Sequence, residues 1–298
     1  MKQNISTDRR KDARTGYLFI LPFVTMFAIF KLYPMVYGFA VSFLNRNSVR
    51  NIGDKSFVGF KNYLKVLQND TFWSSLGNTF TYSLIYATVA MIFAFILAVL
   101  INRTFRGRTV VRTMMYVPYV TNVIAIGIVF KYLLNPKKGP INAIFRMFGV
   151  EGPKWLIDPD LALPITALIG AWLALAFGII TILAALQDIP DDLYEVATIE
   201  GATERQKMLK ISLPMIAPAL FMLLTITIIN SFKSYTIVMA LTEGGPGTAS
   251  RVLSLQIYDD AFNYMKFSIA AAEGVIFTVI VVLINRILNK VRKVWESR

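Results

Sequence analysis

Residues 188–214 read DIPDDLYEVATIEGATERQKMLKISLP, a charged stretch that separates two long apolar runs. Pro190 suits the first position of a helix, and Asp191 and Asp192 suit its first turn, where the positive end of the helix dipole favours acids. Gly201 is a typical helix stop. The stretch therefore predicts a short helix outside the bilayer that ends in a glycine turn.

A second helix is expected directly after this turn. Thr203, with Gln206 three residues later, fits a capping box, in which each residue satisfies a backbone group of the other. The pattern then continues through Pro214 into the next apolar run. The charged stretch is thus predicted to fold as helix, glycine turn and helix.

The composition of the whole chain points to a polytopic membrane protein. Its 298 residues are 55% hydrophobic, with a mean hydropathy of +0.55. Because the sequence contains no Cys and no His, disulfides, thiolate nucleophiles, Ser-His-Asp triads and the common metal sites are excluded. No phosphate-binding G-x-x-x-x-G-K-[ST] motif occurs. The net charge of +13 fits basic loops facing the cytoplasm better than a nucleic-acid partner.

Six apolar runs predict an all-α membrane fold. The expected spans cover about residues 16–43, 73–101, 113–134, 162–186, 215–241 and 267–288. Residues 1–15 and 290–298 are then polar tails of a single membrane domain over residues 16–289. Six spans place both termini on one side, together with the basic segment 102–112 and the stretch 188–214. The positive-inside rule makes that side cytoplasmic, although Lys137 and Lys138 lie on the other.

The stretch 188–214 resembles the EAA loop of ABC importer permeases, whose pattern is E-A-A-x-x-x-G followed by I-x-L-P. The matching residues are Glu195, Ala197, Gly201, Ile211, Leu213 and Pro214. Val196 and Glu200 depart mildly from the pattern, which usually has Ala and Asp there. The resemblance implies a coupling helix that docks on a separate ATPase subunit through Glu195, Ala197, Glu200 and Gly201. An ordinary amphipathic loop helix is the alternative.

Other segments are similar to sugar-importer permeases of the maltose and glycerol-phosphate type. They are FVGFKNY (57–63), NRTFRGR (102–108), WLIDP (155–159) and LTEGGP (241–246). The resemblance implies a type I permease of the bacterial cytoplasmic membrane, the first of two paired permease types. Its implied partners are a second permease, two ATPase subunits that bind ATP and Mg, and an extracytoplasmic solute-binding protein. No cofactor and no catalytic residue are expected in this chain.

The fifth predicted span carries a polar stripe. Thr227, Ser231 and Ser234 lie at i, i+4 and i+7, with Asn230 beside them. Such groups suit a sugar, and transporters place their sites near the membrane midplane. Hydrogen bonding between helices is the alternative. Resemblance to the maltose-type permease implies sugar contacts at Thr227, Ser231 and Ser234, and also at Tyr119, Leu173 and Phe177.

Two charged residues, Lys233 and Glu273, fall inside predicted spans at similar distances from their outer ends. A buried charge without a partner is costly, so pairing between the two is one interpretation. Outward snorkelling of Lys233 is the other.

These patterns together predict half of the pore of an ATP-driven carbohydrate importer. The same machinery carrying glycerol-phosphate or a polyol is an alternative. An ion-coupled secondary transporter is a second one, but it needs an acid at the midplane, and Glu273 lies off-centre. A membrane enzyme lacks His, Cys or paired carboxylates in the spans.

Overall fold

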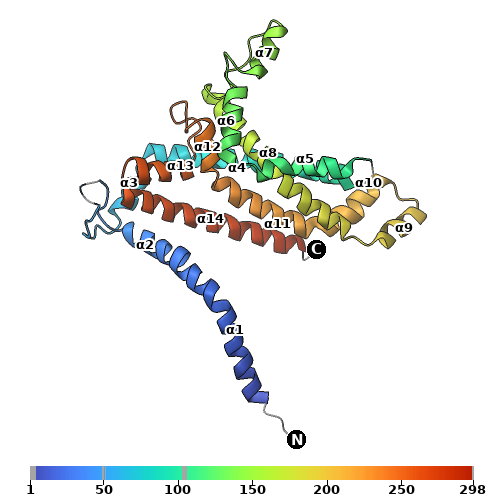
Figure 1. The fold of residues 1–298 in the computed structure, drawn as a ribbon, viewed down its shortest axis with the longest axis horizontal. Helices are drawn as coiled ribbons and strands as arrows, with labels where there is room; N and C mark the ends of the chain where they lie inside the picture. Colours follow the sequence, from blue (N-terminus) through green and yellow to red (C-terminus); the bar gives the residue numbers. More distant parts are fainter. Residues whose placement is uncertain (1–4, 49, 51, 103–105, 297–298) are drawn as a thin grey trace. The chain divides into compact units, whose positions relative to one another are not determined.

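The computed structural model describes residues 5–48, 50, 52–102 and 106–296. Arg103 of the predicted basic loop, and the outermost residues of both predicted tails, lie outside this part. The helices, labelled as in Figure 1, are α1 (Ile5–Phe27), α2 (Tyr33–Val41), α3 (Lys61–Leu67), α4 (Asp70–Asn102), α5 (Arg108–Val120), α6 (Val123–Leu133), α7 (Pro140–Met147), α8 (Pro159–Gln187), α9 (Asp191–Ile199), α10 (Glu204–Lys207), α11 (Leu213–Phe232), α12 (Tyr235–Leu241), α13 (Leu253–Tyr258) and α14 (Phe267–Glu296). Shorter π-helical turns cover Ala28–Leu32, Met208–Ser212 and Asp259–Asn263.

The all-α membrane fold is confirmed in the described ranges. Five helical segments are long and apolar enough to cross a bilayer, namely Tyr17–Val41, Asp70–Asn102, Pro159–Gln187, Glu204–Phe232 and Phe267–Trp295. The bent pair α5 and α6 brings the number to six if it counts as one span.

The helices extend beyond several predicted span boundaries. α1 begins at Ile5 and α14 continues to Glu296, so helix reaches into both predicted tails. α5 begins at Arg108, which shortens the predicted basic loop 102–112. Helices can continue past the apolar run because their backbone groups are satisfied internally in water as well as in lipid.

The chain divides into two compact units, residues 1–68 with 260–275, and residues 69–259 with 276–298. In the first unit, the loop after α2 pairs with the start of α14, where the Ser268 amide donates to the Arg46 carbonyl at 3.1 Å. Ser56 donates to the Asp54 carboxylate through its hydroxyl (2.6 Å) and its amide (2.8 Å), and these bonds hold the pKa of Asp54 below its ordinary value.

The second unit is built on the close approach of α4 to α8. Ala90, Ala94 and Ala98 recur every fourth residue on α4, and all three are buried. A Cβ added to Gly178 on α8 would lie 2.7 Å from the Cβ of Ala94. Small residues at helical spacing let the two backbones approach, as is common in membrane helix pairs. α11 packs against both helices (Figure 1).

We expect Gly178→Ala to destabilise the second unit, because the new methyl group meets the Cβ of Ala94 and neither atom can rotate away. Overpacking of this kind costs about 1–3 kcal/mol. The matched control is Gly77→Ala on α4, where no atom lies within 4 Å of the added Cβ and helix propensity favours Ala. Thermal unfolding of the purified protein measures both variants. Equal midpoints for the two would contradict the close-packed interface.

Candidate functional site

The third predicted span is broken, contrary to the single helix expected over 113–134. α5 ends at Val120, α6 begins at Val123, and the two axes differ by 98°. Pro118 lies in the last turn of α5, and Asn122 caps α6 by accepting from the amides of Ile124 (2.8 Å) and Ala125 (3.3 Å). Thr121 donates its hydroxyl to the carbonyl of Val117 at 2.7 Å. Local side chains therefore satisfy the backbone groups that the break releases.

The fifth predicted span is broken as well, at Lys233 and Ser234 between α11 and α12. The carbonyl of Asn230 accepts from the Lys233 amide at 3.0 Å and from the Ser234 hydroxyl at 3.1 Å, which closes the end of α11. α12 then packs against α6, with Gly127 directly against Ala240. The second helices of two broken spans thus pair with each other.

A cavity of about 390 Å³ lies beside the bend between α5 and α6. Five of the residues expected on the substrate path line it, namely Tyr119, Leu173, Phe177, Thr227 and Asn230. The rings of Tyr119 and Phe177 lie nearly parallel, at 17°, with centroids 6.3 Å apart. The volume of the cavity falls in the range of small-molecule sites, about 300–1,000 Å³. Aromatic faces and hydrogen-bonding groups are therefore gathered at one place, where a helix is broken inside the span.

Sequence reasoning missed Tyr86, Pro118 and Val123, which also line this cavity. Pro118 was a detectable signal, because a proline four residues before an Asn that can cap a helix marks a helix end and a new start. Tyr86 on α4 carries no such signal, since its position depends on how α4 packs against the other helices.

Ser231 and Ser234 do not continue the polar stripe as expected. Ser231 is buried against α4, where its Oγ lies 2.6 Å from Oγ of Ser83 and 2.7 Å from the carbonyl oxygen of Ile228. Ser234 lies past the end of α11, in the break itself. The i, i+4, i+7 rule assumed one continuous helix, and the helix ends at Phe232. Thr227 and Asn230 are the members of the stripe that line the cavity.

The two charged residues expected inside spans lie in different surroundings. Lys233 is exposed at the end of α11, whereas Glu273 on α14 is fully buried. The depth expected for Lys233 assumed an unbroken fifth span, so the break removes that argument. Pairing of Lys233 with Glu273 stays a prediction.

The charged stretch folds as helix, glycine turn and helix. Pro190 precedes the first helical residue as the N-cap, one position earlier than expected, and Asp191 and Asp192 open α9. Gly201 has a φ of +79°. Its amide donates to the carbonyl of Thr198 at 3.0 Å, and the Ala202 amide donates to that of Ala197 at 2.8 Å. These two bonds form a Schellman motif, which needs a left-handed residue at the glycine.

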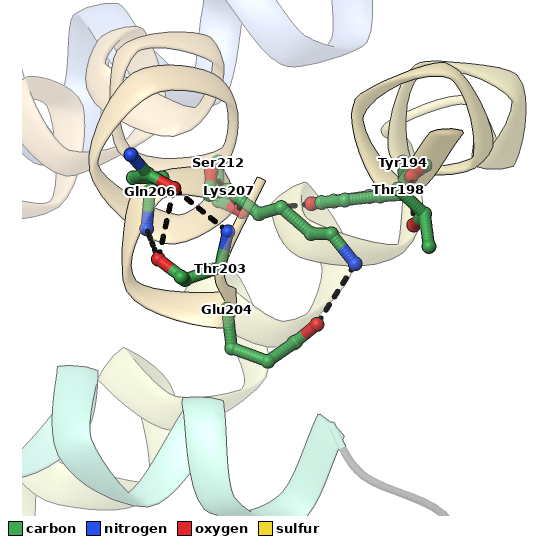
Figure 2. Close-up of polar contacts among 7 residues, drawn as sticks. All are labelled: Tyr194, Thr198, Thr203, Glu204, Gln206, Lys207 and Ser212. Atoms are coloured by element: carbon green, nitrogen blue, oxygen red, sulfur yellow. Dashed lines mark hydrogen bonds and ion pairs between the residues drawn. The ribbon is translucent and has the colours of Figure 1, made fainter. Parts of the chain in front are cut away.

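The second helix starts with the predicted capping box (Figure 2). Thr203 accepts from the Gln206 amide at 3.3 Å, and the Gln206 side chain accepts from the Thr203 amide at 2.7 Å. α10, the π-helical turn Met208–Ser212 and α11 then run on as one helical segment, Glu204–Phe232. The helix predicted to pass through Pro214 is therefore confirmed.

α9 presents an apolar face that the described residues leave partly exposed. Leu193, Val196 and Ile199 are 42%, 55% and 87% exposed. Of the four residues expected to contact an ATPase, Ala197 is buried beneath the helix, while Glu195, Glu200 and Gly201 are exposed. Exposed apolar side chains edged by acids are typical of a surface that meets another protein.

The chain is similar to known transport proteins over most of its length. A model of the family described as "Binding-protein-dependent transport system inner membrane component" matches residues 90–293. The trehalose/maltose transport system permease protein MalF of Thermococcus litoralis is 32% identical, over 98% of this chain and 98% of that protein. The sn-glycerol-3-phosphate transport system permease protein UgpA of Agrobacterium fabrum is 31% identical, over 90% of this chain and 91% of its own.

A solved structure is also similar. It belongs to a bacterial alginate ABC transporter in complex with an alginate pentasaccharide-bound periplasmic protein. The likeness has a TM-score of 0.84 at 26% sequence identity, and it covers 97% of this chain and 96% of the matched chain.

We expect Ser231→Ala to destabilise the protein, because it removes the hydroxyl that bonds α11 to α4. Hydrogen bonds between membrane helices average about 0.6 kcal/mol. Ser83→Ala should cost no more than this, because Ser231 keeps its bond to the Ile228 carbonyl, and the double variant should cost no more than Ser231→Ala alone. Asn230→Ala is the control, since that side chain is exposed at the cavity. Thermal unfolding of the four variants tests this, and additive losses for Ser83 and Ser231 would contradict the shared bond.

Proposed function

The chain belongs to the family of binding-protein-dependent transport system inner membrane components, and from this premise we propose that it forms half of the pore of an ATP-driven carbohydrate importer. The observation that carries the proposal is the pairing, in one compact unit, of a cavity inside the spans with an exposed helix between α8 and α11. A permease needs both features, because the cavity binds the cargo and the exposed helix α9 is the part that an ATPase subunit can displace.

The cargo is a carbohydrate. Relatives transport trehalose and maltose, arabinooligosaccharides and sn-glycerol-3-phosphate, and the similar solved transporter imports alginate. Tyr119 and Phe177 offer apolar ring faces to the C–H face of a sugar, while Thr227 and Asn230 offer hydrogen bonds to its hydroxyls. The described residues that line the cavity include no Lys or Arg, the groups that usually bind phosphate, and this favours a neutral sugar over glycerol-phosphate.

Energy comes from partner subunits. Because the sequence lacks a P-loop, ATP and Mg belong to two ATPase subunits, and α9 offers them Leu193, Val196 and Ile199. A second related permease completes the pore, and an extracytoplasmic solute-binding protein delivers the sugar. The family membership argues against the ion-coupled transporter considered from the sequence. In this scheme the chain itself catalyses no reaction.

The mechanism follows from the order of the elements. Closure of the ATPase dimer displaces α9, which lies in the charged stretch 188–214, called the coupling loop from here on. α8 leads into this loop, and the segment Glu204–Phe232 leads out of it. Phe177 lies on α8, and Thr227 lies on α11. Movement of α9 therefore displaces two walls of the cavity, those formed by α8 and α11. α5 forms a third wall through Tyr119, and the bend at residues 121–122 separates it from α6.

We expect Gly201→Leu to abolish most ATP-driven uptake while the protein still reaches the membrane. Its φ of +79° disfavours any Cβ, by about 1–2 kcal/mol, although no atom lies within 4 Å of the added carbon. The strain therefore falls on the turn after α9 and misdirects that helix. Uptake of radiolabelled sugar by cells with the complete complex measures the effect.

Gly149→Leu is the matched control. Gly149 follows α7, has a φ of +74° and is equally free of neighbours. It should lose similar stability yet keep its uptake. Normal uptake by Gly201→Leu, or equal loss in both variants, would count against a coupling role for α9.

Orientation is tested by single cysteines, which the native chain lacks. We propose that both termini face the cytoplasm. Cysteines at Asp54, Lys138 and Gly247 should then react with an impermeant maleimide added to intact cells. Cysteines at Arg106 and Thr203 should react only after permeabilisation. Labelling of the Thr203 variant in intact cells would invert the proposed topology.

A further inference from the structure

Tyr194 connects α9 to the helical segment that follows the glycine turn at Gly201. Its Oη lies 2.8 Å from Oγ of Ser212, 18 residues further along the chain. Ser212 is 2% exposed and Tyr194 is half-buried, so this bond is partly shielded from water. Figure 2 shows the ring of Tyr194 reaching from α9 toward Ser212. The bond therefore joins the exposed helix to a fixed point inside the bundle.

Ser212 occupies a special place in its own helix. It ends the π-helical turn Met208–Ser212, where the Leu213 amide bonds to the Met208 carbonyl instead of the carbonyl four residues back. Its hydroxyl also lies 3.5 Å from the carbonyl oxygen of Lys207, at the start of that turn. π-helical turns inside α-helices often occur at functional sites and at kinks. The bond from Tyr194 thus reaches an irregular point of the segment Glu204–Phe232.

Packing around this bond is incomplete. A cavity of about 400 Å³ is lined by Tyr194, Lys207 and Ser212, together with Val99, Asn102 and Leu186 near the cytoplasmic ends of α4 and α8. The ion pair of Lys207 with Glu204, at 2.8 Å, stays within α10 (Figure 2). The ring of Tyr194 packs against the hydrophobic core, and Ala197 is buried beneath α9. Beside the cavity, where such packing is missing, the directional hydrogen bond adds a restraint on the distance between α9 and Ser212.

We propose that Tyr194 is a positioning residue that transmits displacement of α9 to α11 through Ser212. Thr227 lies fifteen residues after Ser212, about 22 Å along the helix at about 1.5 Å per residue, and it lines the sugar cavity. The Tyr194–Ser212 hydrogen bond is then the mechanical link between the ATPase-facing helix α9 and the wall of the cavity formed by α11. This inference rests on the proposed function.

The test separates coupling from assembly. Tyr194→Phe keeps the ring and removes only the hydroxyl. In the complex reconstituted with its partner subunits, we expect ATP hydrolysis within twofold of wild type and sugar transported per ATP at least threefold lower. Ser212→Ala should match it, and the double variant should be no worse than either single. Unchanged transport per ATP in Tyr194→Phe would overturn the proposal, as would additive losses.

Thr198→Val is the matched control. Its hydroxyl also lies on α9, but donates at 2.6 Å to the carbonyl of Tyr194 within the same helix. This variant should transport as wild type does. A loss of transport per ATP equal to that of Tyr194→Phe would contradict the proposal, because removal of any hydroxyl on α9 would then have the same effect.

A second readout does not depend on transport. In the wild-type and variant complexes, hydrogen–deuterium exchange is followed in peptides over residues 191–199 and 208–212. Tyr194→Phe should speed exchange in α9 at least threefold, and Thr198→Val should not. Absence of ATP-driven uptake by wild type would refute the proposed function alone. Equal exchange in wild type and Tyr194→Phe would refute the proposed link through the Tyr194–Ser212 bond, whatever the uptake.

Discussion

Close packing of α4 against α8 is the contact on which the site depends. Lipid gives no hydrophobic drive for helices to associate, so the pair relies on van der Waals contact, which Ala94 and Gly178 permit by being small. α8 carries Leu173 and Phe177 to the wall of the cavity beside the α5–α6 bend and ends at Gln187, just before α9. One firmly packed helix therefore holds both the cavity wall and one end of the coupling loop.

Breaks in the spans supply what packing alone cannot. Two continuous helices would leave no irregular backbone between them, whereas the breaks at residues 121–122 and 233–234 turn α6 and α12 toward each other. Asn122, Thr121 and the carbonyl of Asn230 satisfy the released groups, so the breaks persist within an apolar segment. The cavity beside the first break lies where transporters commonly bind their cargo.

The coupling loop could be predicted almost completely from the sequence, because its signals are local. Gly201 and the pair Thr203 and Gln206 act within a few residues of themselves, and each adopts the expected geometry. The polar stripe could not be predicted in the same way. Ser231 bonds to Ser83, 148 residues away, and the end of α11 at Phe232 has no proline or glycine to announce it. The position of Tyr86 likewise depends on tertiary packing.

The measurement that tests the account most directly is sugar uptake into proteoliposomes that contain this chain, the second permease and the ATPase subunits. We expect uptake to require both ATP on the side of α9 and the solute-binding protein on the other side, and to be unchanged when ion gradients are collapsed. Uptake that persists without ATP and stops when the ion gradient collapses would contradict it.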